Sequence, residues 1–258
     1  MKILTIVGTR PELIRLSRII PLIDKYSKQI IVHTGQNFDK NLDKVFFENF
    51  SIRKPDYYLG ARGSFGSQIS TILEKIEKII ENEKPDRFFV LGDTNSSLGA
   101  LMAKRMGVKV YHAEAGNRCY DDKVPEEVNR RIIDHSSDCL LPYTYRSAEN
   151  LVKEGIDRKN IFVIGNPIYE VINYYDKQIN KSNILNKLKL QKKKNFLVTL
   201  HRTENTNDPK RLKNFLDSFK KVHAKYKLDL IWPIHPRSKL SIKDNNLKIP
   251  KGLRTINP

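Results

Sequence analysis

The chain has 258 residues, with 47 lysines and arginines against 29 aspartates and glutamates, which gives a formal net charge of +18. No uncharged apolar run approaches the ~20 residues of a membrane span, and the basic residues form no stripe interleaved with aromatic side chains. These properties argue against membrane and nucleic-acid partners, so we expect a soluble chain with a lysine-rich, solvated surface.

The two cysteines, Cys119 and Cys139, stand in no Cys-x-x-Cys or Cys/His pattern. We therefore expect no metal site and a reducing, cytoplasmic compartment. The first eight residues read as a strand that enters a glycine turn rather than as a signal peptide.

Apolar runs alternate with helical patterns along the first two thirds of the chain, in the order expected of repeated βαβ units. The predicted strands cover residues 3–7, 30–33, 87–91, 108–111, 139–141 and 161–164. The helices predicted between them cover residues 13–22, 41–49, 64–82, 96–106, 126–136 and 147–154. This order predicts an α/β fold with a parallel sheet.

The pattern changes near Tyr174, where a polar segment rich in Asn, Lys and Ser covers about residues 176–194. Strands at 196–200, 228–232 and 253–256 follow, with a helix over 209–226. We therefore expect two domains, residues 1–176 and 177–258. Three strands are few for an independent parallel sheet, so we expect the second domain to be incomplete.

Acidic residues and histidines gather where several predicted strands end. The segments are Gly8-Thr9-Arg10-Pro11-Glu12, Gly92-Asp93-Thr94-Asn95-Ser96, His112-Ala113-Glu114-Ala115-Gly116, Pro125-Glu126-Glu127 and His201-Arg202-Thr203-Glu204-Asn205. The carboxyl ends of parallel strands converge on one crevice, so these side chains can meet at one ligand. The chain therefore reads as an enzyme that acts on a small molecule.

The first of these turns fits a phosphate group. Gly8 permits a tight turn, Thr9 can cap the helix, and Arg10 can offer its planar guanidinium to a phosphate. The alternative is a capped helix with a surface arginine. Neither Gly-x-Gly-x-x-Gly nor a Walker A lysine is present, which argues against dinucleotide and ATP sites.

Asp93 and Glu114 should each project just beyond a buried strand, where the pKa values of acid/base groups are tuned. The alternatives are a helix N-cap for Asp93 and a buried ion pair with Arg118 for Glu114. Glu126, in the Pro125 segment, can simply complement a helix dipole. His201 and His235 follow apolar runs in the second domain, and neither belongs to a metal constellation.

Taken together, the motifs resemble the non-hydrolysing UDP-N-acetylglucosamine 2-epimerases, which have two Rossmann-like domains facing a cleft, the glycosyltransferase-B architecture. The resemblance rests on the five segments above and on His33-Thr34-Gly35-Gln36, Val128-Asn129-Arg130, Gly165-Asn166 and His235-Pro236, in this order. It implies a UDP-sugar isomerase of cell-surface polysaccharide biosynthesis that is a homodimer and uses neither cofactor nor metal. A glutamate-bearing UDP-binding segment of the family's second domain is absent here.

The resemblance also assigns residues. It implies catalytic roles for Asp93, Glu114, Glu126 and His201. It implies substrate-binding roles for Arg10, Arg15, Gln36, Arg130, Arg202, Asn205 and His235, with Arg15 in the place of a lysine found in many members.

The implied reaction is inversion at carbon 2 of UDP-N-acetylglucosamine, by elimination and re-addition of UDP. The stretch Ala115-Gly116-Asn117-Arg118-Cys119 departs from the commonest form and resembles a branch that acts on UDP-2-acetamido-2,6-dideoxy-L-talose to give UDP-N-acetyl-L-fucosamine. A chain that binds nucleotide sugar without catalysis is the alternative of another class.

Overall fold

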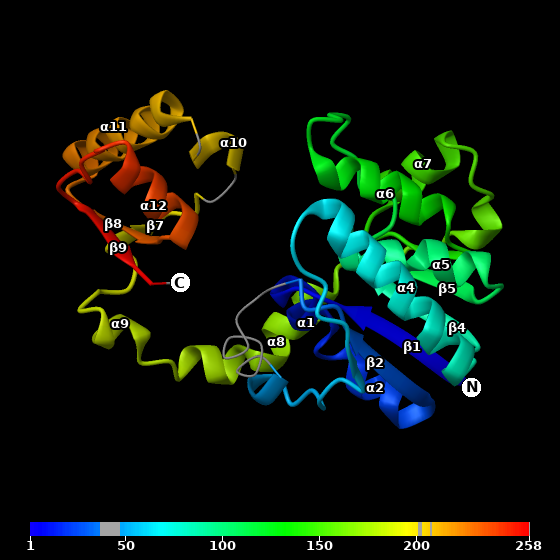
Figure 1. Cartoon of the computed structure of the whole chain (residues 1–258). Coiled ribbons are helices and arrows are strands. Elements are labelled where there is room, and N and C mark those ends of the chain that lie inside the picture. Colours follow the sequence, from blue (N-terminus) through cyan, green and yellow to red (C-terminus); the bar gives the residue numbers. More distant parts are fainter. Residues whose placement is uncertain (37–46, 201–202, 207, 258) are drawn as a thin grey trace. The chain divides into compact units, whose positions relative to one another are not determined.

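The computed structural model describes residues 1–36, 47–200, 203–206 and 208–257. The chain divides into two compact units, Met1–Asp176 and Lys177–Pro258 (Figure 1). In the first unit the strands are β1 (Lys2–Val7), β2 (Lys28–His33), β3 (Tyr57–Tyr58), β4 (Arg87–Leu91), β5 (Lys109–Ala113) and β6 (Cys139–Leu141). Its helices are α1 (Arg10–Leu16), α2 (Ile19–Tyr26), α4 (Phe65–Glu83), η1 (Asn95–Leu98), α5 (Gly99–Arg105), α6 (Pro125–His135), α7 (Tyr145–Lys153) and η2 (Arg158–Asn160).

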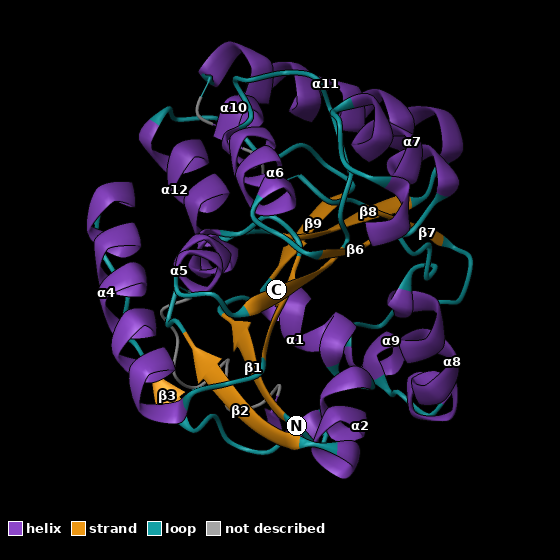
Figure 2. Ribbon diagram, turned by 90° about the vertical axis from the view of Figure 1, so that its right-hand side faces the viewer, coloured by secondary structure: helices purple, strands orange, loops and turns teal. Residues whose placement is uncertain are grey.

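The strands of the first unit form one sheet in the order β3-β2-β1-β4-β5-β6, and each pair is parallel. This is the strand order of the Rossmann fold. Leu4 and Ile6 of β1 pack into a core with α4 and α5, whereas Val7 packs with α1 and α2. Helices therefore cover both faces of the sheet (Figure 2), and the strands are apolar on both sides.

The helix predicted over residues 13–22 is divided into α1 and α2. Pro21 explains the break, because it has no amide hydrogen to donate to the carbonyl of Ser17 and its ring would clash with that carbonyl in a continuous helix. At the break, the hydroxyl of Ser17 donates a hydrogen bond of 2.7 Å to the carbonyl of Ile14. Most of the helix predicted over 41–49 lies outside the described residues. The described part of it, residues 47–49, is helical.

The strand predicted at 161–164 is wrong. Only one bridge, Leu140 to Ile161, links this segment to β6, and Phe162 to Ile164 are exposed. The amide of Ile164 donates to the Pro142 carbonyl at 3.0 Å, but Pro142 has no amide hydrogen with which to continue the ladder.

The second unit contains α9 (Ile184–Lys187), β7 (Asn195–Leu197), α10 (Thr203–Thr206), α11 (Pro209–Tyr226), β8 (Asp229–Pro233), α12 (Pro236–Asp244) and β9 (Leu253–Ile256), and α8 (Pro167–Asn180) crosses the boundary between the units. Its described strands form a parallel sheet in the order β7-β8-β9. Leu212 and Leu216 of α11 pack with the fully buried Trp232 of β8. Asp208 caps α11 by accepting from the amides of Lys210 and Arg211.

Parallel sheets covered by helices in both units confirm the predicted α/β class. Within the described residues, no helix is long and apolar enough to cross a membrane. The same residues contain no cluster of His, Cys, Asp and Glu that could hold a metal ion.

Candidate active site

The turns after β1, β4 and β5 lie at one edge of the sheet in the first unit, because these neighbouring strands are parallel. The turn after β1 approaches its neighbours so closely that only glycine fits at position 8. A Cβ atom on Gly8 would lie 1.9 Å from the Ser96 Oγ and 2.1 Å from the Thr34 Oγ1. Those two hydroxyls are 2.7 Å apart, and the Ser96 hydroxyl also donates to the Gln36 Oε1 at 3.2 Å.

Glu12 holds the turn after β1 to the turn after β4. Its Oε2 accepts hydrogen bonds of 2.7 Å from the amides of Gly8 and Thr9, and its Oε1 accepts one of 2.7 Å from the Thr94 hydroxyl. Burial raises the pKa of Glu12, against the opposing effect of these hydrogen bonds. Because all these donors come from the protein, we assign Glu12 a structural role.

Asp93 is fixed by Arg130 of α6. The Arg130 Nε donates to the Asp93 Oδ2 at 2.7 Å, and the Asn129 Nδ2 donates to the Asp93 carbonyl at 2.9 Å. The N-cap of the following 3-10 helix is Thr94, so the capping alternative for Asp93 is wrong. Burial acts to lower the pKa of Arg130, but the charges of Asp93 and Glu127 outweigh it and raise that pKa.

Glu114 occupies the turn after β5 with a φ of +70°, in the left-handed region. For a residue with a Cβ this conformation costs on the order of 1 kcal/mol or more, so the surrounding hydrogen bonds must maintain it. The Glu114 amide donates to the Leu141 carbonyl at 3.1 Å. Backbone strain at the end of a central strand is typical of functional sites.

The Glu114 carboxylate forms an ion pair with Arg15 through Oε2 and accepts a 3.2 Å hydrogen bond from Asn117 Nδ2 through Oε1. Burial raises the pKa of Glu114, Arg15 opposes this effect, and the nearby charge of Asp93 adds to it. Arg118, considered above as the partner of Glu114, instead pairs with Asp134 and Glu154. A partly buried carboxyl with a raised pKa is a stronger proton acceptor than an ordinary glutamate.

The two glutamates at the start of α6 have different environments. Glu127 is fully buried and accepts from the amides of Cys119 and Tyr120 at 3.0 Å. Burial would raise the pKa of Glu127, but these hydrogen bonds and that of Arg130 lower it to about 2. Glu127 is therefore a permanently ionised anchor, whereas Glu126, to which the resemblance assigns a catalytic role, is exposed on the same turn.

The remaining predicted site residues are divided between the units. Arg10 begins α1 and is partly exposed. In the second unit Asn205 lies in α10 and His235 directly precedes α12, and both are partly buried. His201 and Arg202 lie outside the described residues. The first unit thus brings Arg15, Asp93, Glu114 and Arg130 together.

Sequence reasoning assigned no role to three buried residues beside this group. His112 and Asp134 form a buried pair, with the His112 Nδ1 2.8 Å from the Asp134 Oδ1. Tyr143 is buried next to the Arg15 and Glu114 charges. A histidine at the carboxyl end of a strand was the available signal for the first pair, whereas nothing in the sequence marks Tyr143.

The chain matches a family model described as UDP-N-acetylglucosamine 2-epimerase over residues 23–258. It is 42% identical to a UDP-N-acetylglucosamine 2-epimerase homolog of Methanococcus maripaludis, over the whole chain and 73% of that protein. It is 38% identical to the UDP-2,3-diacetamido-2,3-dideoxy-D-glucuronate 2-epimerase of Pseudomonas aeruginosa, over 96% of the chain and 71% of that protein.

A solved structure extends the similarity to the fold. The UDP-GlcNAc 2-epimerase of Methanocaldococcus jannaschii, in complex with UDP-GlcNAc and UDP, is 39% identical and superposes with a TM-score of 0.91. The alignment covers all of this chain and 74% of that one. The predicted glycosyltransferase-B type of fold is confirmed by this likeness. The chain is an epimerase and belongs to the UDP-N-acetylglucosamine 2-epimerase family.

Proposed function

We propose that the chain inverts carbon 2 of UDP-N-acetylglucosamine to give UDP-N-acetylmannosamine. The observation that carries this proposal is the group at the carboxyl edge of the first sheet, where the carboxylates of Glu114 and Asp93 interact through space and each is paired with an arginine. Two carboxylates with different environments can serve as a base and an acid.

The proposed reaction proceeds by elimination of UDP. A carboxylate removes the proton from carbon 2, the C1–O bond to UDP breaks, and a C1=C2 double bond forms in the sugar. UDP leaves with the electron pair of the broken bond. When UDP adds back to carbon 1, an acid delivers a proton to the opposite face of carbon 2. The route is redox-neutral, so it needs no NAD, and the departing diphosphate is proposed to be stabilised by the arginines named below rather than by a metal ion.

We assign the base to Glu114, because burial raises its pKa and makes its carboxylate a stronger proton acceptor. Asp93, which is paired with Arg130, is the candidate acid on the other face, with Glu126 as its alternative. Arg15 and Arg10 are candidates to stabilise the departing diphosphate, since guanidinium groups bind phosphate through two hydrogen bonds.

The second unit would supply the remaining contacts. His201 remains a proposed catalytic residue. The other residues that remain proposed contacts to the substrate are Gln36, Arg130, Arg202, Asn205 and His235. We also propose a homodimer located in the cytoplasm. The free thiols of Cys119 and Cys139 fit a reducing compartment.

A second candidate substrate is UDP-2-acetamido-2,6-dideoxy-L-talose. The observation that favours it is that Asn117, in the stretch that departs from the commonest form of the family, donates a hydrogen bond directly to Glu114. A relative at 38% identity is named for yet another UDP-sugar, so substrates vary among proteins about this similar.

The test is to incubate the chain with each UDP-sugar and to observe the configuration at carbon 2 by proton NMR. Appearance of UDP-N-acetylmannosamine from UDP-N-acetylglucosamine supports the proposal. Conversion of the deoxy sugar alone would favour the second candidate. Binding of both sugars without conversion of either would show that this chain is a binder rather than a catalyst.

A further inference from the structure

His112 hydrogen-bonds to both of the turns that carry the candidate catalytic carboxylates. It is the fourth residue of β5 and is almost completely buried. Its Nε2 lies 2.9 Å from the carbonyl oxygen of Gly92, the residue before Asp93. Its Nδ1 lies 2.8 Å from the Oδ1 of Asp134, whose carboxylate accepts from the amide of Gly116, two residues after Glu114.

The first of these contacts fixes one proton on the ring. A carbonyl oxygen can only accept, so the Nε2 of His112 must carry a hydrogen. In a neutral imidazole the Nδ1 would then present a lone pair to Asp134.

The state of Asp134 determines whether the ring carries a second proton. The Oδ2 of Asp134 lies 2.8 Å from the Nη2 of Arg118 and 3.1 Å from the amide of Gly116, and both groups are donors. A cation and an amide donor at these distances favour the ionised form of the Asp134 carboxylate, whatever the state of His112. An ionised carboxylate only accepts, and a lone pair facing it at 2.8 Å would be repelled, so the Nδ1 carries a hydrogen as well.

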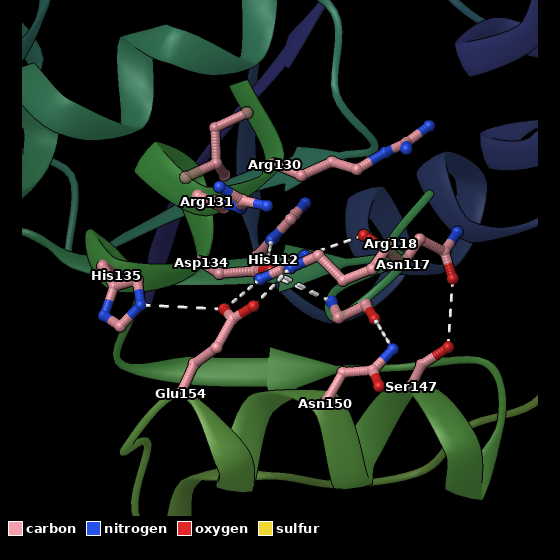
Figure 3. Close-up of polar contacts among 12 residues, drawn as sticks. His112, Asn117, Arg118, Arg130, Arg131, Asp134, His135, Ser147, Asn150 and Glu154 are labelled. Carbon is pink, nitrogen blue, oxygen red and sulfur yellow. Dashed lines mark hydrogen bonds and ion pairs between the residues drawn. The ribbon is translucent and has the colours of Figure 1, made fainter. Parts of the chain in front are cut away.

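The buried charges balance. Asp134 interacts with both His112 and Arg118, and Arg118 also pairs with Glu154. Figure 3 shows these four side chains gathered together. The Nε of Arg118 donates to the Oε1 of Glu154 at 2.8 Å, so two cations face two carboxylates. The strand next to β5 presents the apolar Leu140 to His112, and the charge of Glu114 also acts on His112. His135 lies 3.8 Å from Glu154. Such compensation is what makes a buried ionic group tolerable.

We propose that His112 is a doubly protonated positioning residue that ties the turn of Asp93 to the turn of Glu114. The neutral ring could keep only one of the two contacts. Loss of either contact would break the link through His112 between the turn of Asp93 and the turn of Glu114. The amide of Gly92 also donates a hydrogen bond of 2.9 Å to the carbonyl of Ala113, which joins the same two turns.

The protonation state is tested on the wild-type chain labelled with ¹⁵N-histidine. The signal of His112 is identified as the one that survives when each of the other histidines is replaced in turn. We expect both ring nitrogens of His112 to carry protons, as its two contacts require. A ring that carries only one proton would overturn the proposal. In the Asp134→Asn chain we expect the second proton to be lost.

The positioning role rests on the proposed function and is tested by kinetics. His112→Gln keeps a polar side chain without a charge, and a displaced carboxylate should lower kcat by about a hundredfold while KM changes little. His135→Gln is the matched control, because His135 is exposed and interacts with Glu154 only at 3.8 Å. An unchanged kcat in the His112→Gln chain would overturn the positioning role.

The two tests separate the inference from the function. If the wild-type chain converts no UDP-sugar, the proposed function fails while the NMR measurement still decides the charge of His112. If the chain is active but the His112 ring carries only one proton, the function stands and the inference fails. The NMR measurement does not depend on whether the His112→Gln chain folds.

Discussion

The Nε of Arg130 donates a 2.7 Å hydrogen bond to the Oδ2 of Asp93, and the Nη1 of the same guanidinium donates a 2.9 Å hydrogen bond to Glu127. Because Glu127 is buried and bonded to two backbone amides, it fixes Arg130, and Arg130 in turn fixes Asp93. Asp93 is partly exposed and available for chemistry, whereas Glu127 is structural.

Replacement of Asp93 should affect turnover more than stability. Asp93→Asn nearly preserves the shape of the side chain but cannot deliver a proton as a carboxyl group does, so we expect kcat to fall by about a hundredfold or more. Circular dichroism should show an intact fold. Asp157→Asn, at an exposed position, is the control and should leave kcat unchanged. Glu126→Gln, assayed in parallel, should show a loss of similar size, and near-normal turnover in either chain would remove that residue from the mechanism.

Arg15 should set the pH range in which Glu114 acts as a base. Burial raises the pKa of Glu114 and Arg15 opposes that effect, so Arg15→Gln should raise the pKa further. A base must be deprotonated, and the acidic limb of the kcat/KM profile should therefore move to higher pH. Measurement of this profile for Arg15→Gln and for the exposed control Arg158→Gln tests the prediction. An acidic limb that does not move would show that Arg15 does not set the pKa of the catalytic base.

Glu127 should contribute stability that depends on pH. Its pKa is about 2 in the folded chain, below its ordinary value, so its contribution is complete above about pH 5 and is lost as the pH falls toward 2. The contribution is on the order of 3 kcal/mol. Urea unfolding of Glu127→Gln should show a weaker loss of stability over this range than the wild-type chain. Glu126→Gln, exposed on the same turn, should retain the wild-type slope.

The sequence predicted helices and strands correctly where interactions between residues close in the chain determine them. The strand at 87–91 and the helix at 209–226 match β4 and α11 because apolar runs, Pro209 and the capping Asp208 all act within a few residues. The break between α1 and α2 also had a local cause in Pro21, but the apolar period of the helix continued through it. The strand at 161–164 was predicted wrongly because pairing depends on the partner strand, which contains Pro142.

The sequence predicted which residues could belong to the site, but not which of their side chains form ion pairs. The ends of β4 and β5 indicated Asp93 and Glu114. The sequence did not reveal that Glu114 pairs with Arg15, which lies 99 positions away, rather than with Arg118, which lies four positions away. The pairing depends on the packing of α1 beside the turn after β5. The buried contacts of His112 and Asp134 likewise depend on tertiary structure.

Gly8 should be required by close packing. A Cβ atom there would collide with the hydroxyls of Ser96 and Thr34, so Gly8→Ala should destabilise the chain by about 1–3 kcal/mol. Gly66→Ala is the control, because a Cβ atom at this helical position meets no atom within 4 Å. That change should be neutral or stabilising, by roughly 0.5–1 kcal/mol. Equal melting temperatures for the two variants would contradict the packing described around Gly8.

The most direct test of the proposed chemistry is the fate of the hydrogen on carbon 2. When UDP-N-acetylglucosamine is incubated with the chain in D₂O, abstraction by a carboxylate and return of a solvent-derived proton should place deuterium at carbon 2 of the product. The incorporation should not depend on added NAD or divalent metal, and Glu114→Gln should slow it together with turnover. Proton NMR and mass spectrometry measure it. Product that retains the original hydrogen at carbon 2 would contradict the elimination mechanism.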